Sequence, residues 1–128
     1  MIVDTNVLIQ VYTNETVSYE TVFDNYVLEA PDFVKIEFLN VMRKMHFLNN
    51  VPLSKLELAY EKAMKLIYRF YSSESLLYEA KAISFQLNHP IYDCLFLALA
   101  IRSNQPFLSS DMRLLKKAES IGVKTVYF

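Results

Sequence analysis

Short apolar segments and longer segments with helical spacing alternate along the chain. Four short apolar runs predict strands at 1–3, 27–30, 107–108 and 123–128. Between them, apolar side chains recur every three or four residues, which predicts helices at 14–26, 32–48, 54–69, 76–88, 90–101 and 111–121. Strands near both ends with helices between them predict an α/β fold in which helices wrap a mostly parallel sheet.

Local start and stop signals define these boundaries further. Asp32 is placed as the N-cap of one helix, and Ser54 and Glu57 form a capping-box pattern at the start of another. Gly122 follows the last helix as its C-cap. Neither an internal repeat nor a low-complexity linker interrupts the sequence, so we expect a single domain over residues 1–128.

Composition limits the function classes. The chain has 128 residues, of which 53% are hydrophobic, enough for the core of one domain but not of two. Its formal net charge of −1 excludes the strongly basic balance of a generic nucleic-acid binder, so a polyanion would have to be held by a local patch or a metal ion. One cysteine cannot form an internal disulfide, and the N-terminal segment has no signal-peptide or membrane-anchor pattern. We therefore expect a cytoplasmic protein without membrane contact.

Four acidic residues lie at the ends of predicted apolar strands or within predicted helices that face the core. Asp4 follows the first strand and Asp111 follows the third, at the edge of the sheet where α/β proteins bind ligands. Asp93 lies in the first turn of an otherwise apolar helix, where burying an unpaired charge would cost on the order of several kcal/mol. Glu37 is one turn into the helix after the second strand and shares a polar face with Asn40.

Carboxylates that converge at one edge of a sheet repel each other unless a cation lies between them. Magnesium and manganese are hard ions that take oxygen ligands, bind through a few carboxylates and keep several waters. Such an ion lowers the pKa of water and neutralises charge at phosphorus, which favours hydrolysis of phosphate esters. The acids alone leave the substrate open, because an RNA nuclease, a DNA nuclease and a phosphatase all use this chemistry. A phosphatase with an aspartyl nucleophile would carry a second acid where this chain has Asn6.

Four segments, taken in order, resemble the PIN-domain family, and their spacing is most similar to that of VapC-type toxins from toxin–antitoxin pairs. The segments are Ile2-Val3-Asp4-Thr5-Asn6, Glu37-x-x-Asn40, Tyr92-Asp93-Cys94-Leu95-Phe96-Leu97-Ala98-Leu99-Ala100 and Leu108-Ser109-Ser110-Asp111. Each is weak evidence alone, but together they cover the chain from Asp4 to the terminal strand. The resemblance implies a three-layer α/β/α sandwich with a central, mostly parallel sheet of four or five strands.

The resemblance also implies an activity and a site. The activity is that of a Mg²⁺- or Mn²⁺-dependent endoribonuclease, a toxin that hydrolyses RNA and is restrained by a small antitoxin. The metal ligands would be Asp4, Glu37, Asp93 and Asp111, supported through hydrogen bonds by Asn6, Asn40 and Ser109. Many family members have a further acid where this chain has Met112 and Arg113, which leaves the number of metal ions open.

Structural roles are the alternative for each of these residues. Asp4 and Asp111 could be ordinary turn or helix-cap residues, and Glu37 could be a solvated helix position. Asp93 is the hardest to explain in this way because its neighbours are apolar. The alternative function is a non-catalytic module that kept the fold for dimerisation or partner binding.

The remaining polar residues are assigned no catalytic role. Six basic residues could contact RNA phosphates or could simply form the solvated faces of their helices: Lys35, Arg43, Lys44, Arg102, Arg113 and Lys116. His46 and His89 stand apart from the acids in sequence and are expected to be structural or exposed, and Cys94 is expected to be a core residue. The helices between residues 54 and 87 carry more apolar surface than one small sheet covers, which predicts a homodimer or an antitoxin groove.

Overall fold

The computed structural model of the chain describes residues 1–14 and 23–128. In these residues five strands form one sheet in the order β3-β2-β1-β4-β5, and every neighbouring pair is parallel. The strands are β1 (Ile2–Val3), β2 (Leu28–Pro31), β3 (Ile67–Tyr71), β4 (Phe107–Ser109) and β5 (Thr125–Tyr127). The predicted α/β fold is confirmed, and the sheet of the described residues is parallel throughout.

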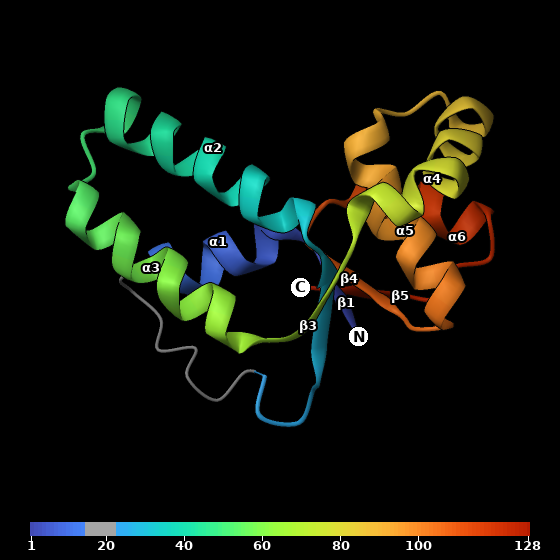
Figure 1. The fold of residues 1–128 in the computed structure, drawn as a ribbon, viewed down its shortest axis with the longest axis horizontal. Helices are drawn as coiled ribbons and strands as arrows, with labels where there is room; N and C mark the ends of the chain where they lie inside the picture. Colours follow the sequence, from blue (N-terminus) through green and yellow to red (C-terminus); the bar gives the residue numbers. More distant parts are fainter. Residues whose placement is uncertain (15–22) are drawn as a thin grey trace.

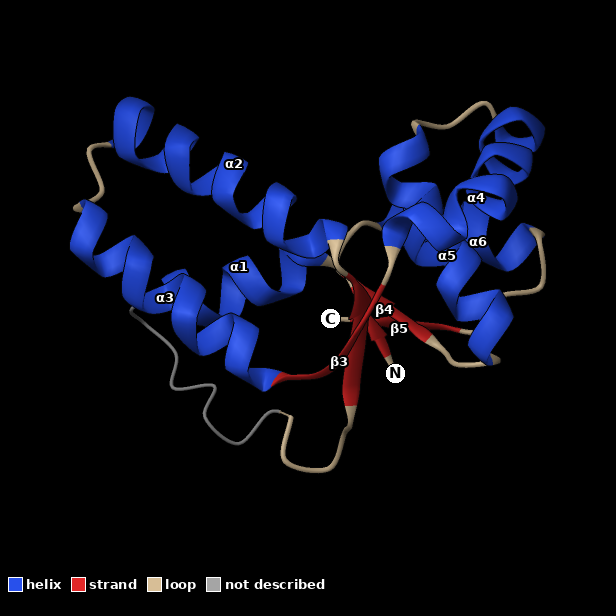
Figure 2. Ribbon diagram, viewed as in Figure 1, coloured by secondary structure: helices blue, strands red, loops and turns tan. Residues whose placement is uncertain are grey.

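Six helices in the described part of the chain cover this sheet (Figure 1). They are α1 (Thr5–Thr13), α2 (Phe33–Asn49), α3 (Leu53–Leu66), α4 (Ser73–Leu87), α5 (Ile91–Ser103) and α6 (Met112–Ser120). Helices α1, α2 and α3 pack together on one side of the sheet, and α4, α5 and α6 lie on the other (Figure 2). The molecule is therefore a three-layer sandwich. None of the helices described is long and apolar enough to cross a membrane.

The direction of the strand order changes between β1 and β4. From β1 the chain proceeds outward to β2 and β3, and it later enters β4 on the opposite side of β1. The two central strands are in register, with Ile2 beside Phe107 and Val3 beside Leu108. Because α1 and α6 leave these strands toward opposite faces (Figure 2), the carboxyl ends of β1 and β4 form a topological switch point, the place where α/β sheets bind ligands.

The core around this switch point is apolar on both faces of the sheet. Ile2, Val3 and Phe107 are fully buried in β1 and β4, and α5 is buried continuously over residues 94–100. Parallel strands covered on both faces need such continuous apolar sequence, which explains why these segments read as short hydrophobic runs. The acids at the ends of these elements are therefore attached to rigid backbone.

The structure places a helix directly after Asp4, where the sequence analysis assigned no element. Asp4 has the extended backbone of an N-cap, and α1 begins at the next residue, so the polar residues Asp4-Thr5-Asn6 after β1 start a helix instead of forming a turn. The helix predicted at 14–26 falls largely outside the described residues, and its described end, 23–25, is a turn.

The boundary of the third helix is also corrected. The helix predicted to continue to residue 69 ends at Leu66, and the following residues form β3 at the edge of the sheet, paired with β2. The capping box predicted at Ser54 is absent, because Pro52 occupies the N-cap position and no side chain caps α3. Asp32 does precede α2, but its Oδ1 accepts a hydrogen bond from the Ser73 amide at 3.0 Å instead of capping its own helix.

Candidate functional site

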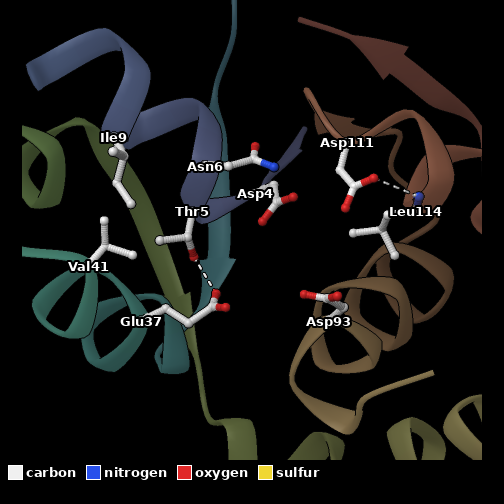
Figure 3. Close-up of a pocket in the computed structure, with 9 residues that line it drawn as sticks. All are labelled: Asp4, Thr5, Asn6, Ile9, Glu37, Val41, Asp93, Asp111 and Leu114. Atoms are coloured by element: carbon white, nitrogen blue, oxygen red, sulfur yellow. Dashed lines mark hydrogen bonds between the residues drawn. The ribbon is translucent and has the colours of Figure 1, made fainter. Parts of the chain in front are cut away.

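A pocket at the carboxyl ends of β1 and β4 is lined by all four acids singled out in the sequence (Figure 3). Its volume is about 160 Å³. The lining residues are Asp4, Thr5, Asn6, Ile9, Glu37, Val41, Asp93, Asp111 and Leu114. Figure 3 shows Asp4 and Glu37 facing Asp93 and Asp111 across the pocket. None of these nine residues is basic, so the lining supplies four carboxylates and no cationic side chain to balance them.

Asp4 is the most buried of the four acids, with 5% of its surface exposed. The register of β1 and β4 brings it beside the buried Ser109, whose Oγ donates a hydrogen bond to Asp4 Oδ2 at 2.6 Å. Burial raises the pKa of Asp4 from 3.8 to about 7; the hydrogen bond from Ser109 opposes this rise, and the negative charges of Asp93 and Glu37 add to it. A nearby cation would remove most of the cost of ionising this group.

Ser109 and Asn6 join the two central strands at the pocket. The Ser109 Oγ that donates to Asp4 also accepts hydrogen bonds from the Asp111 amide at 3.0 Å and from Asn6 Nδ2 at 3.3 Å. Asn6 Oδ1 in turn accepts from the Ser110 amide at 3.4 Å. Two of the three residues predicted to support the acids therefore contact them or their immediate neighbours.

Glu37 reaches the pocket from α2, whose core-facing side is formed by Val34 and Phe38. Its Oε1 accepts a hydrogen bond of 2.5 Å from Thr5 Oγ1, and burial raises its pKa, opposed by this hydrogen bond and reinforced by the charge of Asp93. Thr5 lies between Asp4 and Asn6 in the first motif but was not among the residues predicted for the site.

Asn40, the third predicted supporting residue, is not among the lining residues. It is exposed on α2, and its Oδ1 accepts hydrogen bonds from Arg43 at 3.3 and 3.4 Å. A role for Asn40 at the site therefore stays a prediction.

Asp111 is at once a pocket residue and a helix cap. Its Oδ1 accepts hydrogen bonds from the amides of Arg113 at 3.0 Å and Leu114 at 3.1 Å, which makes it the N-cap of α6. The side chain is exposed, so this carboxylate lies at the solvent side of the pocket. The helix-cap role considered for Asp111 is therefore confirmed, and its role as a metal ligand stays a prediction.

Asp93 enters from the first turn of α5 and has a partner that the sequence analysis did not recognise. The ring of His89 lies against it, with 2.6 Å between His89 Nε2 and Asp93 Oδ2. His89 was expected to stand apart from the acids and to be structural or exposed; its contact with Asp93 corrects the first point, and its largely buried side chain is consistent with a structural role. The spacing of four residues was a usable signal, since a side chain just before a helix can reach the first turn.

Cys94 is buried, and burial together with the charge of Asp93 raises the pKa of its thiol to about 11.

The donor set suits a hard divalent ion. Every carboxylate in the pocket is fixed through a hydrogen bond or close polar contact by Thr5, Ser109, His89 or the start of α6. In this conformation no three His, Cys, Asp or Glu side chains of the described residues are grouped closely enough to hold one ion between them. Magnesium commonly binds through one or two carboxylates and several waters, so the remaining acids would act through water.

The basic residues considered as RNA contacts differ in their surroundings. Arg102 pairs with Glu79 at 2.6 Å, and Lys35 lies over the ring of Phe70 at 4.3 Å from its centroid. Arg113, by contrast, lines a second pocket of about 280 Å³ that shares Asp111 with the first. This second pocket places positive charge beside the acidic one.

Comparisons with known proteins agree with this architecture. The family model described as "PIN domain" matches residues 1–120 of the chain. A search of curated proteins gave no significant match. Among solved structures, the crystal structure of PAE2754 from Pyrobaculum aerophilum is similar, with a TM-score of 0.74 and 18% sequence identity over 98% of this chain and 89% of that one. At that identity the structural likeness shows the fold alone.

Proposed function

This chain belongs to the PIN domain family, whose members are generally metal-dependent nucleases, and from that premise we propose that it is a Mg²⁺- or Mn²⁺-dependent endoribonuclease. One observation carries the proposal: a pocket at the switch point of the sheet is lined by four carboxylates and by no basic residue. The burial of Asp4 and the raised pKa values of Asp4 and Glu37 support it, because a divalent cation would compensate the charge that the protein leaves unbalanced.

The four acids would hold the ion, each in a different setting. Asp4 is buried, Glu37 and Asp93 are partly buried, and Asp111 lies at the solvent side where a substrate can approach. Their partners limit the rotation of each carboxylate, so that the ligand oxygens are oriented before metal or substrate arrives. A bound Mg²⁺ or Mn²⁺ supplies a Lewis acid that lowers the pKa of water and offsets negative charge on the phosphodiester.

We propose RNA as the substrate because of the resemblance to VapC-type toxins, and the positive charge beside the pocket suits the phosphates of a nucleic-acid strand. Arg113 is exposed and lines the adjoining pocket beside the shared Asp111, whereas Lys117 in the same pocket contacts His89. A strand whose scissile phosphate lies over the acids would have a neighbouring phosphate near Arg113, whose positive charge contributes affinity without reading sequence. We place this activity in the cytoplasm and in one domain spanning residues 1–128.

A toxin requires a protein that restrains it, and the groove between α2 and α3 supports such a partner. This groove, of about 430 Å³, is lined on its apolar sides by Leu39, Met42, Phe47, Leu53 and Tyr60, and Phe47 is 72% exposed. We propose that a small antitoxin covers it. Light scattering of the purified chain, alone and with the product of a neighbouring gene, tests this; a homodimer that buries the groove would contradict it.

The direct test is RNA cleavage by the purified protein with Mg²⁺ or Mn²⁺, with and without a chelator. Asp93→Asn removes one charge with little change of shape and should reduce cleavage at least a hundredfold, as loss of a group that holds the ion at the reacting phosphate. Asp24→Asn, an exposed turn residue away from the pocket, is the matched control and should cleave like the parent. Equal activity of the parent and Asp93→Asn, or activity that persists in chelator, would contradict the proposal.

A further inference from the structure

Behind Asp93 lies a connected pair of side chains that the proposed chemistry has not yet used. His89 Nε2 is 2.6 Å from Asp93 Oδ2, and Lys117 Nζ is 2.9 Å from the other ring nitrogen, His89 Nδ1. The three side chains come from the loop between α4 and α5, the first turn of α5 and the last turn of α6. Lys117, His89 and Asp93 thus form a row of three side chains in contact. Its central member, His89, has a side chain that is only 14% exposed.

The chemistry of the two end groups fixes the direction of the hydrogen bonds. An ammonium group has donors and no acceptor, so His89 Nδ1 must accept from Lys117 through its lone pair. The ring then carries its proton on Nε2, where it donates to the carboxylate of Asp93. Lys117 therefore selects the tautomer of His89 that can hold Asp93.

The backbone of His89 is held as firmly as its ring. Its amide donates to the carbonyl of Ser84 at 3.1 Å, and its carbonyl accepts from Ser84 Oγ at 2.6 Å. The preceding Asn88 ends α4 in the left-handed conformation, and Pro90 follows directly. The ring consequently has little freedom to leave Asp93.

The row also connects two acids of the pocket. Lys117 belongs to α6, the helix that Asp111 caps, while Asp93 belongs to α5. The contact from Lys117 through His89 therefore ties the carboxylate of Asp93 to the helix that carries Asp111. Ser109 gives the corresponding link between Asp4 and Asp111 on the sheet side.

We propose that His89 and Lys117 are positioning residues: Lys117 fixes His89 as an Nε2–H donor, and His89 holds Asp93 in place for divalent-ion binding. This inference rests on the proposed function, in which Asp93 is one of the carboxylates that hold the divalent ion. Partners of metal ligands typically change metal affinity 10- to 100-fold, roughly, when they are removed. Neither residue touches the substrate in this proposal.

The test measures metal binding without RNA. Mn²⁺ affinity is determined by calorimetry for the parent, Lys117→Met, His89→Ala and the double variant. Each single variant should bind Mn²⁺ about tenfold or more weakly, and the double variant should be no weaker than His89→Ala, since Lys117 acts only through the ring. Lys116→Met, which removes the neighbouring exposed charge from α6, is the control and should bind like the parent.

Two further readouts separate positioning from other roles. In the parent protein, nitrogen NMR should show His89 Nδ1 unprotonated and Nε2 protonated, a measurement that needs no variant to fold. In cleavage assays, Lys117→Met should regain the parent rate at saturating Mn²⁺ with an unchanged KM for RNA. The opposite tautomer, additive losses in the double variant, or a raised KM with unchanged Mn²⁺ affinity would overturn the inference, the last by making Lys117 a substrate contact.

The same experiments distinguish this inference from the proposed function. If Asp93→Asn abolishes cleavage while Lys117→Met and His89→Ala bind Mn²⁺ like the parent, the positioning role is wrong and the nuclease stands. If Asp93→Asn itself binds Mn²⁺ and cleaves RNA normally, the proposed four-carboxylate metal site is wrong, whatever the other two variants do; if the parent does not cleave RNA at all, the proposed function is wrong.

Discussion

Replacing Asp4 with asparagine should stabilise the metal-free protein at neutral and alkaline pH. Asp4 is 5% exposed, and burial raises its pKa to about 7 from the ordinary 3.8. A carboxyl group with a raised pKa binds its proton more tightly in the folded than in the unfolded chain. The parent is therefore penalised increasingly as the pH rises from about 3.8 to about 7, and by a constant amount above that.

The size of the effect follows from this difference in pKa. Each pKa unit corresponds to about 1.36 kcal/mol, so the full penalty on the folded parent is about 4 kcal/mol. Asparagine is nearly the same size, and its Oδ1 can accept the hydrogen bond from Ser109. Its amide is still a buried polar group that needs partners, so we expect a net gain of about 1–3 kcal/mol above pH 7.

Urea denaturation followed by circular dichroism, in the presence of a chelator, measures this gain at pH 4, 6 and 8. The stability of Asp4→Asn relative to the parent should rise by about 3–4 kcal/mol from pH 4 to pH 8, so that the variant is the less stable protein at pH 4 and the more stable one at pH 8. Asp24→Asn, in an exposed turn, should match the parent throughout. Added Mn²⁺ should stabilise the parent more than the Asp4 variant, because binding to the folded state adds to stability.

The reasoning fails if Asp4→Asn is no more stable than the parent at pH 8 without metal. A gain of the same size at pH 4 and pH 8 would also refute it, because that result would assign the effect to packing and not to the buried charge.

Two other substitutions test neighbouring parts of the site. Ser109→Ala removes the donor to Asp4 and the acceptor for the Asp111 amide, and should lower the free energy of unfolding by about 1–3 kcal/mol in urea denaturation; an unchanged midpoint would contradict this. Arg113→Ala should raise the KM for RNA severalfold and weaken its salt dependence while leaving kcat and Mn²⁺ affinity intact. Lys62→Ala, which removes an exposed charge on α3, serves as its control. Equal KM values for the two variants would show that Arg113 does not contact the RNA.

The four acids could be predicted as a site because they occur within or directly after apolar segments, where a charged residue is unusual. Asp93 precedes seven helical residues that are all buried. A charged residue is rarely placed beside such a segment unless a partner or an ion compensates its charge. Asp4 and Asp111 follow apolar strands, and the strand order observed here brings those two strands together. The parallel pairing of β1 with β4 therefore brings Asp4 and Asp111, which are far apart in the sequence, to the same pocket.

The errors arose where local patterns were ambiguous. The helix was predicted to run to residue 69 because no glycine or proline interrupts its spacing, although the aromatic and β-branched residues at 67–71 also favour a strand. The pairing with β2 decides between the two. The triplet after β1 has the composition of a turn, although Asp4 in fact begins α1. The contact between His89 and Lys117 depends on how α6 packs near the start of α5, which single-sequence patterns do not encode.

The pairing of β1 with β4 has a consequence for metal affinity. Asp4 follows β1 and Asp111 follows β4, so the pairing of these strands sets their separation, while Glu37 and Asp93 enter the pocket from α2 and α5 on opposite faces of the sheet. Ligand distances in a metal site must hold to within about 0.2 Å. In the proposed metal site, main-chain hydrogen bonds such as the 2.9 Å bond from the Asp4 amide to the Leu108 carbonyl would limit how far the acids after β1 and β4 can move apart. Backbone atoms that do not contact the ion would then contribute to its affinity, and a partner protein that displaces β1 relative to β4 would weaken metal binding without contacting the acids.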